Sequence, residues 1–315
     1  MILVTGATGF IGRHLVSRLL ADGYQVRCLI PPEQVGNLPW ENPPEIVEGH
    51  MFDEEALFRA MTGVHVIFHL ANAQWWGRPR DLERVELVGT RNLVAAARAA
   101  RVGRLITLSH LGAAQSSAYP LMQIKGLVEE TIRDSGLAYT IIRSGLVFGE
   151  EDSFINHIAL SLRANPLFFL MPGRGEVVLH LIHIDDLIEA LTRSLSHIEV
   201  VDALIEIGGP EYITLVDLIH TVMRVTQMPR VVIPVPPYVL RWTSALYSRV
   251  LPRSLMTPQW LDILATNRTA QLGKTYQYFG FHPRRLEDTL LTYMRGRNFW
   301  TPLMRSSLRR RPRGI

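Results

Sequence analysis

The eight residues from Thr5 to Gly12, Thr-Gly-Ala-Thr-Gly-Phe-Ile-Gly, constrain the fold more than any other stretch of the sequence. They follow an apolar run at residues 2–5 that predicts a strand, and they open a segment at residues 13–22 that predicts a helix. In this setting Gly6 permits a tight turn, Gly9 lets the backbone approach a pyrophosphate, and Gly12 permits close packing of helix on strand. The helix N-terminus then offers free N–H groups to the phosphates. The motif predicts a dinucleotide site formed by Gly6, Thr8, Gly9, Phe10, Ile11 and Gly12.

Short β-branched runs alternate with longer helical patterns through the first half of the chain, which is typical of a parallel sheet with crossover connections. The further strands expected are Gln25–Ile30, Glu45–Val47, Val64–Leu70, Arg104–Ser109 and Ala138–Arg143, and the further helices are Glu54–Met61, Leu87–Ala100 and Gly126–Asp134. We therefore predict an α/β fold with a Rossmann-type, doubly wound parallel sheet.

Beyond about residue 150, prolines become frequent and the rhythm of the pattern changes. Helices expected at Leu215–Val225 and Tyr238–Leu251 alternate there with short strands. This predicts a smaller C-terminal α+β lobe at the carboxyl edge of the sheet, where ligands of doubly wound folds bind. We divide the chain into a dinucleotide-binding domain (1–150), a smaller substrate or partner lobe interleaved with it (151–294) and a basic tail (295–315).

Composition narrows the class of protein. Hydrophobic residues make up 47% and charged residues 20% of the 315 residues, which is ordinary for a chain with a large core and excludes disorder. A single cysteine, Cys28, excludes a disulfide framework and a cysteine-based zinc site, and it fits a reducing compartment. The N-terminus lacks the pattern of a signal peptide, and no apolar run reaches about 18 residues. We therefore expect a cytoplasmic protein that is at most peripheral at a membrane.

Further motifs extend the pattern beyond the glycine turn. They are Asp53, Phe68-His69-Leu70-Ala71, Gly89-Thr90-Arg91-Asn92-Leu93, Leu108-Ser109, Arg143-Ser144-Gly145-Leu146-Val147-Phe148-Gly149, His183-Ile184-Asp185-Asp186 and Gly208-Gly209-Pro210. With them, the sequence resembles the extended and atypical short-chain dehydrogenase/reductases up to about Leu291. It is most similar to the atypical branch that includes NmrA-like regulators, the 39-kDa accessory subunit of respiratory complex I and photosystem assembly factors, and it also resembles NAD-dependent epimerases and dehydratases. The resemblance implies that NAD(P)H is the cofactor and that Ala71, Ser109 and Lys125 also contact it.

The choice between NAD and NADP stays open at this level. An acidic residue at the end of the second strand would hold the ribose hydroxyls of NAD, and an arginine there would favour the phosphate of NADP. That position is Pro31, followed by Pro32 and Glu33, so neither signal is present. Arg13 and Arg27 are nearby basic candidates, although a surface role is the commoner explanation for an arginine. The aspartate that usually meets the adenine after the third strand in the family is replaced here by His50.

Catalysis in the resembling family uses a tyrosine as general acid/base and a lysine four residues later. A nearby ammonium favours the phenolate and lowers the pKa of the tyrosine towards the operating pH. Lys125 occupies the lysine position, but the residue four positions earlier is Leu121. Tyr119 is the alternative phenol, and Pro120 makes the segment before Leu121 non-helical, so a loop can direct its ring inward; packing at the lobe interface is the preferred interpretation. Lys125 can still bind the cofactor ribose without transferring protons.

Other polar and aromatic groups carry weaker signals. Asp185 and Asp186, with His183, follow an expected strand at residues 177–182, where carboxylates favour a helix N-terminus, so we expect them to cap the next helix. The histidines show no metal-ligand spacing, and we predict no metal. Trp75-Trp76 follows the fourth strand. These two side chains suit either a wall for a bulky substrate or a partner surface.

Positive charge is concentrated at the C-terminus. No acidic residue follows Asp288, and the seven arginines beyond it exceed the net charge of +4, so the body of the protein is mildly acidic. A solvated tail is the commonest explanation. The tail also suits a membrane protein complex or an anionic membrane surface. The amphipathic pattern of Tyr238–Leu251 and the pair Phe299-Trp300 fit such a peripheral contact, although a buried helix has the same pattern. Nucleic acid is not expected as a partner.

Two functions are consistent with these features. The first is an NAD(P)-binding protein with a degenerate Tyr–Lys site, acting as an accessory, assembly or redox-sensing subunit. The alternative is an NAD(P)-dependent oxidoreductase or epimerase that acts on a bulky apolar substrate and uses Lys125, since hydride transfer needs geometry and a polarising group besides the cofactor.

Overall fold

Seven parallel strands form the central sheet of the computed structural model, which describes residues 1–36, 38–72, 82–242 and 258–297. Their order across the sheet is β10-β6-β5-β4-β1-β2-β3. In chain order the strands are β1 (Ile2–Thr5), β2 (Val26–Ile30), β3 (Glu45–Glu48), β4 (Val66–His69), β5 (Arg104–His110), β6 (Ala138–Ser144) and β10 (Ala203–Ile207). The chain order reverses between β1 and β4, and in folds of this kind ligands bind at that point.

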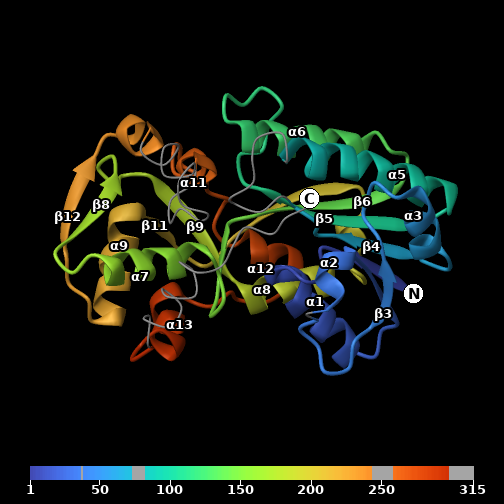
Figure 1. Ribbon diagram of the computed structural model, residues 1–315, viewed down its shortest axis with the longest axis horizontal. Coiled ribbons are helices and arrows are strands. Elements are labelled where there is room, and N and C mark those ends of the chain that lie inside the picture. The colour runs from blue at the N-terminus through green and yellow to red at the C-terminus, as the bar shows by residue number, and fades with distance from the viewer. Residues whose placement is uncertain (37, 73–81, 243–257, 298–315) are drawn as a thin grey trace.

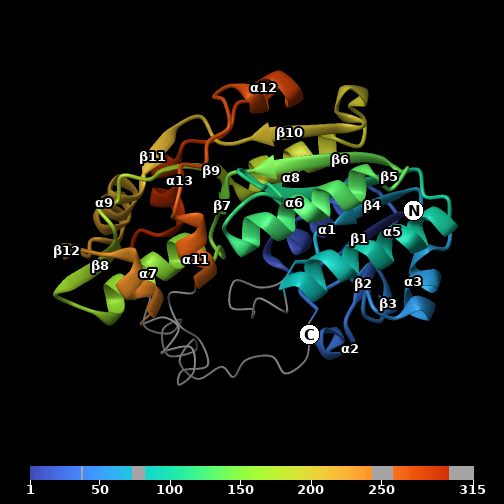
Figure 2. The ribbon, with the colours of Figure 1, turned by 90° about the horizontal axis from the view of Figure 1, so that it is seen from above.

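Helices cover both faces of the sheet. One face carries α1 (Phe10–Ala21) and α8 (Ile184–Arg193), and the other carries α3 (Glu54–Met61), α5 (Gly89–Ala99) and α6 (Pro120–Arg133), as the two views in Figures 1 and 2 show. Alternate residues of β1 enter different cores: Leu3 packs under α3 and α5, whereas Ile2 and Val4 pack under α1 and α8. This two-sided burial explains why the strands are nearly continuous apolar runs. The predicted Rossmann-type parallel sheet is confirmed.

Two helical boundaries differ from the sequence expectation on the face covered by α5 and α6. The helix α6 begins at Pro120, six residues earlier than predicted, and Lys125 therefore lies inside it. Proline suits the first helical position because its missing N–H would have no intrahelical partner there. Before α5, residues Glu83–Val88 form a π-helical segment, η1, a rare geometry that often marks functional sites.

A smaller α+β lobe lies at the end of the molecule opposite α3 and α5 (Figure 1), as predicted. It contains a three-stranded sheet in the order β11-β9-β7 and a two-stranded parallel sheet of β8 and β12. The strands are β7 (Leu146–Phe148), β8 (Phe168–Pro172), β9 (Val178–His183), β11 (Tyr212–Thr214) and β12 (Val231–Val235), and the helices are α7 (Phe154–Ala164), α9 (Leu215–Thr226), α11 (Pro258–Ile263) and α13 (Leu286–Tyr293). The chain returns from this lobe to add α8 and β10 to the first one. The boundaries proposed at residues 150 and 294 stay predictions.

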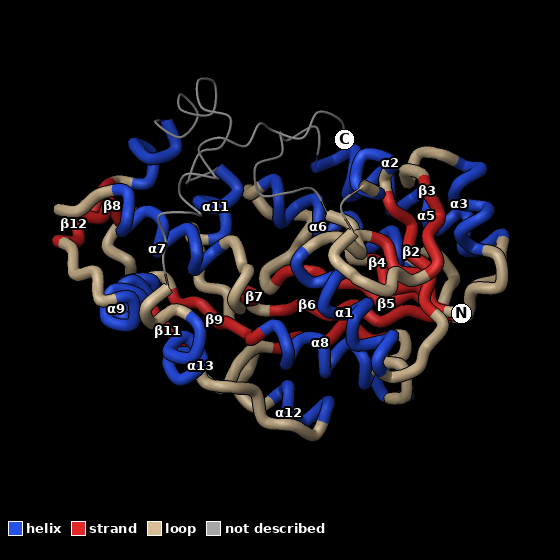
Figure 3. Tube along the Cα trace, turned by 60° about the horizontal axis from the view of Figure 1, so that its bottom comes forward, coloured by secondary structure: helices blue, strands red, loops and turns tan. Residues whose placement is uncertain are grey.

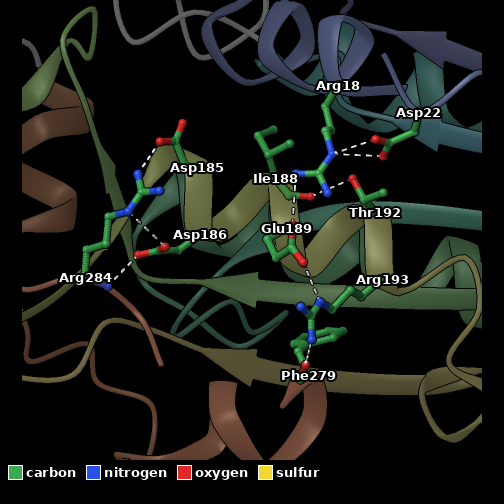
Figure 4. Close-up of polar contacts among 10 residues, drawn as sticks. All are labelled: Arg18, Asp22, Asp185, Asp186, Ile188, Glu189, Thr192, Arg193, Phe279 and Arg284. Atoms are coloured by element: carbon green, nitrogen blue, oxygen red, sulfur yellow. Dashed lines mark hydrogen bonds and ion pairs between the residues drawn. The ribbon is translucent and has the colours of Figure 1, made fainter. Parts of the chain in front are cut away.

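Ion pairs join α8 to the elements around it. Arg18 of α1 binds Asp22, which follows the last residue of α1, and also Glu189 of α8. Arg193 of α8 binds the same Glu189. It also donates to the carbonyl of Phe279, at the end of α12 (Lys274–Phe279). Figure 4 shows these contacts, and Figure 3 shows α1, α8 and α12 on the same side of the sheet. Glu189 and Arg193 of α8 thus connect α1 with the end of α12. None of the helices in the described ranges is long and apolar enough to cross a lipid bilayer.

Candidate cofactor-binding and catalytic site

The glycine turn forms a close-fitting cradle at the carboxyl end of β1. Gly6 has a φ of +70°, and a Cβ atom there would lie 2.5 Å from the backbone nitrogen of Ala71. A Cβ at Gly12 would lie 2.1 Å from the carbonyl oxygen of Gly6, whereas one at Gly9 would meet only that oxygen, at 3.2 Å. Gly9 is the N-cap of α1, no side chain makes a capping hydrogen bond at this helix end, and no acid lies in its first turn. The free N–H groups and the open space beside Gly9 fit the pyrophosphate of a dinucleotide.

A cavity of about 130 Å³ lies beside this turn. Its lining includes four of the predicted cofactor residues, Gly6, Thr8, Gly9 and Ala71, together with the segment after β2, residues 49–52 and Asn72. Phe10, Ile11 and Gly12 lie in the first turn of α1 and outside this lining: Phe10 packs against His14, and Ile11 packs against the core under α1. Ser109 and Lys125 also lie outside the lining.

Sequence reasoning missed an acidic group in this cavity. Glu33, in the short helix α2 (Pro32–Val35), lines the cavity, and its carboxylate lies 3.6 Å from Nε2 of His50. Gln34 of the same helix accepts a hydrogen bond from the hydroxyl of Thr8 at 2.5 Å, which fixes α2 against the glycine turn. The pair of prolines that ends β2 turns the chain, so the acid reaches the cavity three residues after the strand rather than directly after it. An acid within a few residues of a diproline is the signal that could have identified it.

The two basic candidates near the cavity are engaged elsewhere. Arg27 lies 2.8 Å from Glu45 and donates to the carbonyls of Ala60 and Thr62 on the α3 side of the sheet. Arg13 forms an ion pair with Glu151 at 2.5 Å. Among the described residues that line the cavity there is no lysine or arginine.

Lys125 forms a buried ion pair. Its ammonium donates to Oε2 of Glu86 at 2.7 Å, and the two side chains are 7% and 3% exposed. Glu86 belongs to the π-helical segment, which packs against α6 and brings the carboxylate to the lysine. Leu121, one turn before Lys125, is buried in the same core. Sequence reasoning missed Glu86, which is 39 residues away from Lys125 and follows no motif.

A chain of hydrogen bonds runs beside this pair. The hydroxyl of Thr90 donates to the carbonyl of Glu86, so it accepts from Nε2 of His69 at 2.9 Å, and Nδ1 of His69 then accepts from Thr5 at 2.8 Å. This order requires a neutral His69 with its proton on Nε2. Burial, with a smaller effect of the nearby Lys125 charge, lowers the pKa of His69 to about 3. The network joins the end of β4 to the backbone of Glu86, and His69 is neutral within it.

Tyr119 and Ser109 occupy different surroundings. Tyr119 is the N-cap residue of α6 and packs against the core that lies under α3, α5 and α6. No hydrogen bond joins it to Lys125 within the part of the chain that the structure describes, and its phenol is close enough to Arg268 to affect that residue electrostatically. Arg268 itself is buried and donates to the carbonyls of Leu111 and Asp262. The hydroxyl of Ser109, at the end of β5, is buried and has no hydrogen-bond partner among the described residues.

The acids at the start of α8 form an ion-pair site rather than the expected cap. The N-cap is His183, whose Nδ1 accepts from the backbone N–H of Asp185. Asp185 and Asp186 lie in the first turn and bind Arg284, which also donates its backbone N–H to Asp186 (Figure 4). The acids therefore anchor the segment after α12 to α8. No group of three or more potential metal-ligating side chains occurs in the described ranges.

Several expectations lie outside the described residues. These are the Trp75-Trp76 pair, Phe299-Trp300, most of the basic tail and the second half of the helix expected at Tyr238–Leu251.

Comparison with known proteins agrees with this geometry. Residues 6–158 match a family of NAD(P)H-binding proteins. The photosystem II assembly factor Ycf39 of Cyanophora paradoxa is 37% identical over 145 residues, which cover 45% of this chain and 44% of the relative. A mitochondrial subunit of NADH dehydrogenase, 1 alpha subcomplex subunit 9 of Mus musculus, is 27% identical over 78% of this chain and 66% of its own. A ceramide reductase of Caulobacter vibrioides is 29% identical over 59% of this chain and 58% of its own. The matched region thus spans less than half of the first relative and just under two thirds of the second.

Solved structures share the fold over the whole chain. The structure of MoeE5 in complex with UDP-glucose and NAD covers 98% of this chain and 99% of its own, with a TM-score of 0.71 and 20% sequence identity. At this identity the likeness concerns the arrangement of the strands and helices.

Proposed function

Because residues 6–158 match a family of NAD(P)H-binding proteins, we propose that the chain is a member of the NmrA-like branch of the short-chain dehydrogenase/reductases and acts as an accessory or assembly subunit. In this function the dinucleotide holds the native fold instead of taking part in turnover. A ligand that binds only the native state stabilises it by mass action. The names of two relatives, an assembly factor and a respiratory-complex subunit, support the proposal.

The observation that carries this proposal is the Lys125–Glu86 ion pair. A lysine lowers the pKa of a phenol when its charge is uncompensated beside it. Here the ammonium is 2.7 Å from a carboxylate, and Leu121 stands where the phenol would be. The glycine cradle is complete, so the residues support cofactor binding while the proton-transfer pair is degenerate.

A thermal-shift titration with NADH, NADPH and their oxidised forms tests the proposal. At about 100 times Kd a native-state ligand adds roughly 2.7 kcal/mol, so at least one dinucleotide should raise Tm by several degrees. Gly9→Ala fills the open space at the pyrophosphate and should abolish the shift, whereas Gly36→Ala should retain it, since a Cβ there meets no atom within 4 Å. The proposal fails if none of the four dinucleotides stabilises the wild-type protein.

The orphan hydroxyl of Ser109 favours the alternative, an NAD(P)-dependent oxidoreductase. A buried hydroxyl without a partner costs free energy unless a ligand satisfies it. Ser109 is the penultimate residue of β5, and the charge of Lys125 lowers the pKa of both His69, at the end of β4, and His110, at the end of β5. A bound nicotinamide would supply or accept the hydride, and these two side chains would orient a carbonyl group. The name of the ceramide reductase relative suggests a bulky apolar substrate.

A spectrophotometric screen distinguishes the two functions. Long-chain ketones and aldehydes would be offered with NADH or NADPH, and oxidation would be followed at 340 nm. The accessory function predicts no turnover above background. Turnover that persists in Gly36→Ala and disappears in both Ser109→Ala and Lys125→Met would instead establish the enzyme.

Glu33 supports a preference for NAD over NADP. A carboxylate at the ribose end of such a site accepts from the 2′-hydroxyl and repels a 2′-phosphate. Glu33 lines the cavity, and Arg13 and Arg27 are both held by other acids. We expect the Kd for NAD⁺ to be at least about tenfold lower than for NADP⁺, a difference of about 1.4 kcal/mol. Calorimetry should show that Glu33→Gln brings the Kd values for NAD⁺ and NADP⁺ closer together and that Glu33→Arg reverses the preference. Equal affinities in the wild-type protein would contradict the assignment.

The partner in this proposal is a membrane protein complex or an anionic membrane surface reached through the basic tail. The excess of arginine after Asp288 supports an acidic partner. Deleting residues 305–315 should weaken association with isolated membranes and leave the dinucleotide shift unchanged. Unchanged association would exclude the tail as the contact.

A further inference from the structure

The two-stranded sheet of β8 and β12 presents an apolar outer face to solvent. The strands are parallel, with Val231 beside Phe168 and Ile233 beside Leu170. All four side chains are exposed, whereas Phe169, which alternates with them along β8, is buried in the core. Side chains alternate between the two faces of a strand, so these four lie on one face. An exposed sheet face of this composition is unusual for a surface that meets only water.

Further large apolar side chains are exposed in the segments that flank the two strands. Leu167 precedes β8 and is 71% exposed. After β12, residues 237–242 are helical and carry Tyr238 and Trp242, which are 74% and 70% exposed. This end of the chain adjoins the end of β8, because a Cβ at Gly173 would contact Pro237. Figure 1 shows β12 at the end of the molecule farthest from α3 and α5. We call the seven residues Leu167, Phe168, Leu170, Val231, Ile233, Tyr238 and Trp242 the tip face.

All the charged residues in the two chain segments that carry the tip face are arginines. Segments 163–175 and 226–242 contain Arg163, Arg174, Arg230 and Arg241, and neither segment contains an aspartate or glutamate. Arg230 is held by the carbonyls of residues 162 and 165, and it makes no ion pair with a carboxylate in the described part of the chain. Arg174 is exposed and makes no ion pair within the described residues. Arg241 pairs with Asp262. The first acidic residue after the segment 163–175 is Glu176. The net charge of these two segments is therefore positive, and Arg174 exposes its charge to solvent.

We infer that the tip face docks on a lipid bilayer that contains anionic lipids. A sheet face suits a planar surface, and apolar side chains beside cationic ones bind the boundary between headgroups and acyl chains. Tyrosine and tryptophan prefer this boundary because their rings are apolar and their polar atoms reach water. Arginines beside the tip face are attracted by anionic headgroups. This surface is separate from the cofactor cavity and from the basic tail, so the inference does not depend on dinucleotide binding.

Co-sedimentation of the full chain with vesicles tests the inference, using a matched pair of substitutions. Val231→Glu places a carboxylate in the tip face, and Ile198→Glu makes the same change in charge on an 83% exposed residue next to β10, in the other lobe. Both positions are exposed, so both proteins should fold, which circular dichroism and thermal melting would check. The tail is present in every protein compared, and its contribution to vesicle binding cancels.

The expected result is binding to phosphatidylglycerol-containing vesicles that exceeds binding to phosphatidylcholine vesicles about tenfold and falls between 50 and 300 mM salt. Val231→Glu should lower this binding at least about tenfold, and Ile198→Glu should change it less than twofold. Arg174→Gln, which removes one exposed positive charge beside the tip face, should reduce the preference for anionic vesicles about threefold. Equal binding of the two glutamate variants would overturn the inference. So would binding only to native membranes that retain their proteins, since that result would identify a protein partner on the same face.

Discussion

The ion pair between Lys125 and Glu86 leads to a prediction about stability. At 2.7 Å the attraction between the two charges is about 6 kcal/mol for an effective dielectric constant of about 20. Desolvation of two buried charges offsets most of this energy, so the pair as a whole contributes little. Removing one partner leaves the other charge buried and unpaired, which costs about 3–5 kcal/mol. We therefore expect Glu86→Gln, which keeps the side-chain volume, to destabilise the protein by about that amount.

A double-mutant cycle measures this coupling directly. Urea unfolding followed by tryptophan fluorescence would compare the wild-type protein, Glu86→Gln, Lys125→Met and the double variant. The double variant should be at least about 2 kcal/mol more stable than the sum of the single changes predicts, because it leaves no unpaired charge. Glu55→Gln is the matched control, since Glu55 pairs with Arg59 on the surface and its loss should cost a few tenths of a kcal/mol.

The result that would refute this reasoning is additivity. If the two single changes add within about 0.5 kcal/mol, the charges do not interact across a desolvated contact. A cost for Glu86→Gln no larger than that for Glu55→Gln would lead to the same conclusion. The Lys125 ammonium would then be free to act on a substrate, and the proposed loss of proton transfer would be contradicted.

Three further predictions concern pH and packing. Burial raises the pKa of Asp152 to about 7, so its contribution to stability is complete below about pH 4 and is lost as the pH rises through 7; urea unfolding of Asp152→Asn should lack this fall between pH 4 and 7. The pH dependence of stability due to His69 has the opposite sign, because its lowered pKa reduces stability as the pH falls from 6.5 towards 3. The ¹⁵N chemical shifts of His69 should show a neutral ring with Nε2–H at pH 5. Gly12→Ala should lower Tm strongly, because the Cβ overlaps the Gly6 carbonyl oxygen, whereas Gly36→Ala should leave Tm nearly unchanged; equal Tm values would contradict the cradle geometry.

Local patterns were sufficient to predict much of the fold. The helix predicted at Glu54–Met61 has those bounds in the structure, and the strand predicted at Ile2–Thr5 does too. The start of α6 differs from the predicted one because Pro120 begins the helix instead of interrupting it, since proline is favourable at a first helical position. The acid in the cofactor cavity was missed for a similar reason: the diproline moves Glu33 from the expected position at the strand end to a short helix beyond it.

The sequence by itself determined the glycine cradle, the alternation of strands and helices, and the presence of Leu121 four residues before Lys125. Each of these depends on residues a few positions apart, whose geometry follows from backbone conformation and side-chain periodicity. Only the tertiary structure decided that Glu86 neutralises Lys125, that Glu33 and His50 share a cavity, and that β8 and β12 form one exposed apolar face. These contacts join segments 17 to 63 residues apart. They depend on which helices and strands pack together, and no local pattern encodes that choice.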